Sequence, residues 1–405
     1  MWLERCPTEP DRPRGTIVET VFPKEDRNMI RTIGLAATIA WSLSSVVAAC
    51  PFCSAVSQTL SEEIASMDAV VIARLVQAPP AKKDASGTPT KVVFQIDEIL
   101  KGKSHLRGQR RIELLYYGKA EAGDRFLIQG VDPPELMWST PLKLTPRAIE
   151  YVKALPKLPP KGPQRLAFFW KHLEDREDWL ARDAYDEYAR APYDAVKAAK
   201  EVFDHDQLIE WIRDGDIPAS RRRLYFTLLG VCGSKADNPL LEQLLRSSEK
   251  KDKAGLDALA ACYLTINGAE GLPLLEELYL ANTEADYAET YSVIQAIQFH
   301  GTSAKLIPKE RLLVSLRLVL DRPAVADLVI PNLARWQDWS QIDRLAELFR
   351  KADEKTTYVR LPIASYLLAC PLPQAKKRLE ELEKIDPGAI RRARTFLTFG
   401  TDTNQ

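Results

Sequence analysis

The chain lacks an excess of charge of either sign. Its 405 residues include 56 Lys and Arg and 56 Asp and Glu, so the formal net charge at pH 7 is zero. Proteins that bind nucleic acid or anionic surfaces usually carry a basic excess, so we expect no nucleic-acid partner. Six cysteines and 18 glycines are too few for a disulfide-dense or a collagen-like protein. Hydrophobic residues make up 45% of the chain, which is enough for a large buried core.

Short catalytic and metal-binding motifs are also missing. The sequence contains no HExxH motif, no phosphate-binding glycine loop, no paired CxxC zinc motif and no CxxCH haem motif. The four histidines, His105, His172, His205 and His300, are too scattered to indicate a set of metal ligands. We therefore assign no catalytic residue, no metal ligand and no cofactor, and the sequence favours a non-catalytic protein over an enzyme.

The apolar residues near the start of the chain form one run that begins late. Residues 1–28 mix prolines with both charges, and we expect them to be disordered or not translated. Met29 and Arg31 then precede an apolar run that ends in the small residues Val47-Ala48-Ala49, so 29–49 has the pattern of a secretory signal peptide. Two alternatives stay open, a lipoprotein signal and a retained transmembrane anchor. All three predict an exported chain that is periplasmic, secreted or membrane-anchored.

Two cysteines lie directly after this segment, in Cys50-Pro51-Phe52-Cys53. We expect Cys50 and Cys53 to form a structural disulfide, or Cys50 to be a lipid anchor. A thiol-redox enzyme is the alternative, because a closely spaced pair can have a lowered thiol pKa. Thioredoxin-like enzymes place such a pair after a β-strand, whereas an export segment precedes this one. The distant Cys232, Cys262 and Cys370 lie among apolar residues at helical spacing, and we expect them to be small buried hydrophobic residues.

The region 50–155 has the pattern of a β domain. Short β-branched and alternating runs are separated by turn residues, without helical patterns between them. The predicted strands are 69–76, 91–101, 111–117 and 125–129, with a fifth beginning at Met137-Trp138. Such a series predicts a small barrel or sandwich.

Three motifs in this region carry a resemblance to a family. Met67-Asp68-Ala69-Val70-Val71-Ile72-Ala73-Arg74, Ile99-Leu100-Lys101-Gly102 and Asp124-Arg125-Phe126-Leu127-Ile128-Gln129-Gly130 follow the cysteine pair in order. This arrangement resembles netrin-like domains, the family of the tissue inhibitors of metalloproteinases, and implies an OB-type barrel. In those inhibitors the amine of an N-terminal cysteine chelates the zinc of the target, which makes a metalloprotease inhibitor acting through Cys50 a further alternative. The partner cysteines of that family are absent from residues 54–155.

A proline-rich segment, 156–163, predicts an extended linker and a domain boundary. Residues 164–218 then show helical spacing and predict a helical connector. Seven acidic residues are scattered along its first half, and we expect them on a solvated helix face. They are Glu174, Asp175, Glu177, Asp178, Asp183, Asp186 and Glu187.

A repeat follows over 219–390, with a tail at 391–405. A Leu-x-x-Leu pair recurs at offsets of 34, 38, 32 and 34 residues, and a second apolar helical pattern precedes each pair. The pairs are Leu241/Leu244, Leu275/Leu278, Leu313/Leu316, Leu345/Leu348 and Leu379/Leu382. Two helices per period predict an α-solenoid that resembles HEAT-like repeats. The predicted fold class is thus multidomain α+β, an OB-like barrel followed by an all-α solenoid.

These features predict an exported binding or scaffold protein of the cell envelope. Helical arrays bind through extended surfaces, so we expect a protein partner, with membrane attachment through the N-terminal segment as a further possibility. Arg221, Arg222 and Arg223 form a basic run at the start of a repeat helix. The run is a candidate anion contact, and a solvated helix face is the alternative interpretation.

Overall fold

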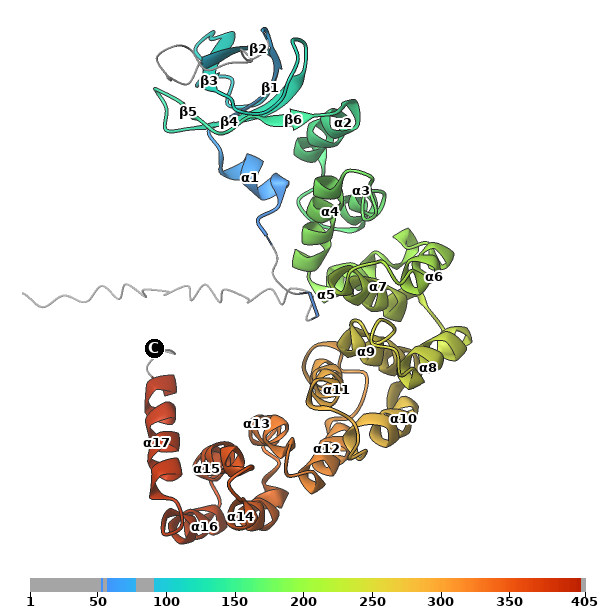
Figure 1. Ribbon diagram of the computed structural model, residues 1–405, viewed down its shortest axis with the longest axis vertical. Coiled ribbons are helices and arrows are strands. Elements are labelled where there is room, and N and C mark those ends of the chain that lie inside the picture. The colour runs from blue at the N-terminus through green and yellow to red at the C-terminus, as the bar shows by residue number, and fades with distance from the viewer. Residues whose placement is uncertain (1–51, 54–56, 78–90, 402–405) are drawn as a thin grey trace, which may run out of the picture. The chain divides into compact units, whose positions relative to one another are not determined.

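The structure begins with a sheet and continues with helices. The computed structural model describes residues 52–53, 57–77 and 91–401. Its six-stranded antiparallel sheet is barrel-like and has the order β3-β2-β1-β4-β5, with β6 beside β4 (Figure 1). The strands are β1 (Ala69–Leu75), β2 (Lys91–Lys101), β3 (Arg111–Leu115), β4 (Arg125–Val131), β5 (Met137–Trp138) and β6 (Leu142–Leu144). The predicted mixed α+β architecture and the five predicted strands are confirmed, and β6 is an addition.

Strand β1 is buried on both of its faces. Because successive side chains of a strand point to opposite sides, Val70 and Ile72 join the core shared with the helices. Val71 and Ala73 point instead into the barrel, where the rings of Phe94 and Phe126 lie edge to face. This two-sided burial explains the continuous β-branched run in the sequence.

Gly102 ends β2 in a conformation that requires glycine. Its φ is +76°, and a Cβ atom there would lie 2.0 Å from the backbone oxygen of Asp68. The turn therefore closes directly against the residue that precedes β1, which holds the first two strands in register.

The helices fall into an N-terminal group and a repeating group. The first group is α1 (Leu60–Ser66), α2 (Pro146–Ala154), α3 (Pro163–Trp170), α4 (Asp178–Arg190), α5 (Tyr193–Ala198) and α6 (His205–Arg213). The second is α7 (Ala219–Cys232), α8 (Asn238–Arg246), α9 (Leu256–Asn267), α10 (Leu272–Leu275), α11 (Tyr287–Phe299), α12 (Lys309–Leu318), α13 (Ile330–Arg335), α14 (Ile342–Lys351), α15 (Arg360–Ala369), α16 (Pro373–Glu383) and α17 (Pro387–Thr401).

Helix α2 lies where we expected the end of the β domain. Thr145 caps it by accepting the backbone N–H of Ala148, and Pro146 occupies its first turn. The proline-rich segment then begins with a 3-10 turn, and Leu155 of that turn is buried. One hydrophobic core runs from the outer face of β1 through these residues into the helices.

The five leucine pairs lie on helices that alternate with other helices along the chain. All five Leu-x-x-Leu pairs lie on α8, α10 with the π-helical turn that continues it, α12, α14 and α16. The helices between them form a second layer, in which α9 packs against α7 and α11, and α15 packs against α13 and α17 (Figure 1). Contacts between the two layers include α8 with α9, the turn after α10 with α11, α14 with α15, and α16 with α15 and α17.

Buried arginines satisfy backbone carbonyls at the ends of these helices. Arg322 is 7% exposed, and its guanidinium donates to the carbonyls of Tyr279 (2.6 Å), Leu280 (3.3 Å) and Ala285 (2.6 Å), and to the Thr290 hydroxyl (3.0 Å). The last carbonyls of a helix have no intrahelical donors. Arg322 therefore supplies donors to the turn that joins the end of one helix to the start of α11.

Two other arginines act in the same way. Arg222 donates to the carbonyls of Lys251 and Asp252, and Arg360 donates to the carbonyl of Ala352 at 2.9 Å. Both lie in the first turn of a helix and reach the turn beside it. The arrangement recurs because the helix pair recurs.

Helix α17 extends into the segment that we expected to be a tail. It runs from Pro387 to Thr401, and Ala389, Ile390 and Ala393 are fully buried against the preceding helices. These three side chains have helical spacing, so the segment closes the last exposed apolar face of α15.

One helical stretch of the described residues is long and apolar enough to cross a membrane, Leu256–Leu280. Of its most apolar window, 56% is buried among the neighbouring helices. Core helices of soluble proteins have the same property, so this stretch is weak evidence for a membrane span.

We predict that Arg322→Met lowers the free energy of unfolding by about 3 kcal/mol, because it leaves several buried carbonyls without donors. Urea unfolding followed by circular dichroism measures this loss. The matched control is Arg246→Ala, which removes an exposed arginine whose distance to Glu277 is 3.8 Å. The control should change the free energy by less than about 0.5 kcal/mol. Equal effects of the two substitutions would contradict the role of Arg322.

Candidate functional site

The residues nearest the predicted cysteine site lie on the helices. Cys50 is outside the described residues, and so is the predicted segment 29–49. Cys53 is half-buried, and the adjacent Phe52 is 6% exposed. The Phe52 ring packs edge to face on Phe299 of α11, with centroids 5.1 Å apart. The chain just after the predicted export segment is therefore anchored on the helical array.

The candidate anion contact is occupied by groups of the chain itself. Arg221 forms an ion pair with Glu174 (2.5 Å), and Arg223 forms one with Asp257 (2.8 Å). Arg222 is 2% exposed and donates to backbone carbonyls before α9. The solvated face that we considered is wrong for Arg222. The three arginines are brought together along α7, but each points to a different internal partner.

Three of the four acidic residues of α4 are buried, contrary to the expected solvated face, and only Asp178 is exposed. Asp183, Asp186 and Glu187 are 8%, 3% and 8% exposed. Their spacing of three and four residues places them on one side of the helix. That side faces the segment that precedes and begins α1, so it is covered by another part of the chain. Asp175, which precedes α4, is also buried and pairs with Arg147.

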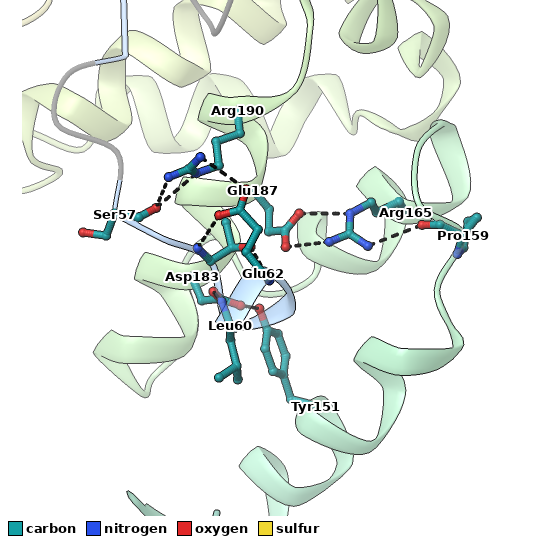
Figure 2. A network of polar contacts seen from close by, with 10 residues as sticks. Ser57, Leu60, Glu62, Tyr151, Pro159, Arg165, Asp183, Glu187 and Arg190 are labelled. Atoms are coloured by element: carbon teal, nitrogen blue, oxygen red, sulfur yellow. Dashed lines mark hydrogen bonds and ion pairs between the residues drawn. The ribbon is translucent and has the colours of Figure 1, made fainter. Parts of the chain in front are cut away.

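The segment Ser57–Glu62 is held by this acidic row through its backbone (Figure 2). The N–H of Leu60 donates to Oδ1 of Asp183 at 2.6 Å, and the N–H of Ser57 donates to Oδ1 of Asp186 at 3.3 Å. The first N–H groups of a helix have no intrahelical acceptors and carry a partial positive charge. Asp183 therefore accepts from the first N–H group of α1, and Asp186 holds the segment that precedes the helix.

Asp183 is shared between two elements. Its Oδ2 accepts a hydrogen bond from the hydroxyl of Tyr151 on α2 at 2.5 Å. Burial raises the pKa of Asp183 to about 6, and the hydrogen bonds from Leu60 and Tyr151 oppose that rise. Burial and the nearby Asp183 charge raise the pKa of Tyr151 as well. This one carboxylate ties α1, α2 and α4 together.

Two arginines complete the network (Figure 2). Arg165 of α3 binds Glu187 in a bidentate manner, with distances of 2.9 and 2.6 Å. Arg190 donates to the backbone oxygen of Ser57 at 3.1 and 3.0 Å and to the carboxylate of Glu62 at 3.2 Å. Planar bidentate pairs of this kind fix orientation as well as distance. We call the residues of this network the α4 clamp. They are Ser57, Leu60, Glu62, Tyr151, Arg165, Asp183, Asp186, Glu187 and Arg190.

A cavity of about 290 Å³ lies beside the α4 clamp. Apolar groups such as Leu166, Pro192 and Ala195 line it together with both clamp arginines. Those arginines are already engaged by Glu187, Glu62 and Ser57, so the cavity offers few unsatisfied polar groups. Its geometry suits structural support more than ligand chemistry.

The other predicted cysteines lie on or directly after helices of the array, Cys232 on α7, Cys262 on α9 and Cys370 after α15. Burial raises the pKa of the Cys232 thiol to about 11 and that of Cys262 well above its usual range, so neither is reactive. Cys262 and Cys370 are buried, as we predicted, whereas Cys232 is only half-buried. No group of three or more His, Cys, Asp or Glu side chains that could hold a metal occurs among the described residues.

The clamp was missed by the sequence analysis, although one signal for it was present. Asp183, Asp186 and Glu187 share a helix side with the spacing that usually marks a buried face. What the sequence did not show was the covering segment, because Leu60 lies 123 residues before Asp183. Thr59 and Glu62 also form a capping box, which indicates the start of α1.

We predict a pH-dependent difference in stability between the wild-type chain and Asp183→Asn. The folded-state pKa of Asp183 is about 6, above its value near 4 in unfolded chains, so protonation favours the folded state. The stabilisation by this proton is present below pH 4 and is lost as the pH rises through about 6. Relative to the variant, the wild-type chain should therefore lose at most about 3 kcal/mol between pH 4 and pH 7.

Urea unfolding of both proteins at several pH values measures this difference. Asp178→Asn, at an exposed position in the first turn of the same helix, controls for the removal of one negative charge. A difference between wild type and Asp183→Asn that stays constant over this pH range would contradict the buried position of Asp183.

Comparisons with protein-family models, with curated proteins and with solved structures find no match to this chain. The α4 clamp is therefore interpreted from its own geometry. The family resemblances noted in the sequence remain predictions.

Proposed function

We propose that this chain is an exported, non-catalytic binding protein of the cell envelope. In this proposal the helices from α7 to α17 form a HEAT-like solenoid that presents an extended surface to a protein partner. The barrel-like sheet is an OB-type domain of the netrin-like kind, fixed to the start of the solenoid by the α4 clamp. The observation that carries the proposal is a ladder of ion pairs between successive helix pairs.

The ladder joins residues that lie about one repeat apart. Arg223 pairs with Asp257, and Lys253 pairs with Glu289, over 34 and 36 residues. Two further pairs follow over 35 residues each, Arg311 with Glu276 at 2.5 Å and Arg378 with Asp343 at 2.9 Å. These separations match the 32 to 38 residues between leucine pairs in the sequence. Equivalent positions of neighbouring repeats are thus in contact, as stacking of one unit on the next requires.

Buried tyrosine hydroxyls add a second set of ties between neighbouring units. The hydroxyl of Tyr279 donates to the backbone oxygen of Leu245, and that of Tyr366 donates to the oxygen of Asp338 at 2.5 Å. A stack held by direct polar ties and by a continuous core has a fixed surface. Rigid surfaces lose little entropy on binding, which supports a role in protein recognition.

We predict that a photo-crosslinking amino acid in place of Val314 or Tyr291 forms adducts with an envelope protein in living cells. Val314 on α12 and Tyr291 on α11 are 48% and 45% exposed, and they sample both helix layers. The matched control replaces Tyr117, which is 78% exposed and follows β3. Adducts at neither helical position, under conditions where a known envelope complex is crosslinked, would contradict the proposed binding role.

We also predict that alkaline phosphatase fused after Gln405 is active in cells that make the chain. The enzyme is active only outside the cytoplasm, so its activity reports export independently of any partner. Deletion of residues 29–49 should abolish the activity while the fusion protein is still made. An inactive fusion of full length would contradict export and leave the binding proposal to the crosslinking experiment.

A further inference from the structure

Three exposed tyrosines mark one edge of the helical array. Tyr287 and Tyr291 of α11 are 54% and 45% exposed, and Tyr358, just before α15, is 45% exposed. The rings of Tyr287 and Tyr291 are stacked, with an interplanar angle of 10° and centroids 6.5 Å apart. Together with Asp327, described below, we call these residues the tyrosine edge. Exposed aromatic side chains in such a group are typical of recognition surfaces.

The tyrosine edge is held in place by neighbouring repeats. The hydroxyl of Tyr358 donates to the backbone oxygen of Ala324 at 2.7 Å. The amide of Gln295 donates to the hydroxyl of Tyr291 at 2.7 Å. Arg322, through its bonds to the turn before α11, fixes the helix start that carries Tyr287. Binding to this surface would therefore require little reorganisation of its backbone.

A carboxylate without a cationic partner lies among these rings. Asp327 is half-buried, and its Oδ1 is buried without a hydrogen-bond partner. Among the described residues no lysine, arginine or histidine forms an ion pair with Asp327; burial raises its pKa, and backbone hydrogen bonds at Asp327 and Leu328 oppose that rise. Burial and the Asp327 charge raise the pKa of both Tyr287 and Tyr358, and the hydrogen bond from Tyr358 to the oxygen of Ala324 holds that tyrosine beside the same loop. A half-buried carboxylate in this state is stabilised by a cation that approaches from outside.

The surroundings of the tyrosine edge are acidic. The loops that begin α11, α13 and α15, residues 282–289, 321–328 and 352–358, carry seven acidic and two basic side chains. The acidic ones are Glu284, Asp286, Glu289, Asp321, Asp327, Asp353 and Glu354, and the basic ones are Arg322 and Lys355. Arg322 is buried against backbone carbonyls, so its charge is little exposed at the surface. Lys253 and Arg344, from outside these loops, pair with Glu289 and Asp321, so five acidic side chains remain against Lys355. The local field therefore still attracts cations.

We propose that the tyrosine edge binds an arginine or lysine side chain of a basic segment of the partner protein. The proposal rests on the proposed binding function and names the chemistry that the surface recognises. The cation lies over the exposed tyrosine rings, close to the negative charge of Asp327. An anionic segment is repelled by the acidic loops, and an apolar segment would leave Asp327 unpaired.

The chain itself contains the same kind of contact. The ammonium of Lys197 lies 5.3 Å from the ring centroid of Tyr193, and that of Lys253 lies 5.4 Å from the centroid of Tyr279. A cation within about 6 Å of an aromatic face is attracted by the ring, and exposed examples are individually weak. At the tyrosine edge, the two stacked rings and the charge of Asp327 attract a cation together.

The test uses the full mature chain and a short peptide probe. The probe is Gly-Arg-Gly-Arg-Gly amide with a neutral BODIPY label, followed by fluorescence anisotropy. Matched peptides carry citrulline or glutamate in place of arginine, because citrulline keeps the shape of arginine without its charge. We expect the arginine peptide to bind at least tenfold more tightly than either control peptide, and to weaken as salt is raised.

Variants of the chain locate the binding. Asp327→Asn and the double substitution Tyr287→Ala with Tyr291→Ala should each weaken the arginine peptide about tenfold. Tyr287→Phe with Tyr291→Phe should retain most of the affinity, because the aromatic faces remain. Tyr117→Ala, at an exposed tyrosine outside the tyrosine edge, should have no effect. Thermal melting of each variant confirms that the array is folded.

Three results would overturn the proposal. They are equal binding of the citrulline peptide, unchanged binding to folded Asp327→Asn, and equal losses in Tyr117→Ala and the double alanine variant. If any of these occurs while crosslinks still form at Val314, the tyrosine edge is not the site but the binding function stands. If crosslinks are absent while the arginine peptide binds as predicted, the binding function fails and the cation site stands.

Discussion

Each reversal between two helices leaves backbone carbonyls without donors, and the structure depends on how these are satisfied. Arg222, Arg322 and Arg360 reach from one helix into a neighbouring turn and donate to its carbonyls. An arginine suits this role because its planar group presents several donors in fixed directions. The ion-pair ladder and the tyrosine hydroxyls then connect units whose turns are already fixed. Packing of the leucine faces alone would leave the turns without polar partners.

The sequence predicted those features that depend on local periodicity. Five strands and all five leucine pairs were found because side chains two, three or four residues apart share a face. Helix α2 was missed, although Thr145 and Pro146 mark its start. The predicted tail, 391–405, begins inside α17, because Ile390 and Ala393 were not recognised as one buried helix face.

The α4 clamp was beyond prediction for a different reason. Whether Asp183 and Asp186 face water or protein is decided by Ser57 and Leu60, which are more than 120 residues earlier in the chain. A row of carboxylates on one side of a helix has the same sequence pattern whether that side faces water or protein. Burial also changes the acidity of the row, because it raises the pKa of Asp183 to about 6 in the folded chain. The arginine run at 221–223 shows the converse, since charges that suggested a ligand are used inside the fold.

The contact between Phe52 and Phe299 has a consequence for how the chain is made. The two rings are 5.1 Å apart but separated by 247 residues, the difference between 299 and 52. During synthesis, the beginning of the chain emerges long before α11 exists. The Phe52 ring therefore cannot pack on Phe299 until about three quarters of the polypeptide has been made. Contacts between residues so far apart in the sequence slow folding, and hydrophobic surface stays exposed until they form. A chaperone that covers the apolar segment until α11 has been made would protect such a nascent chain from association.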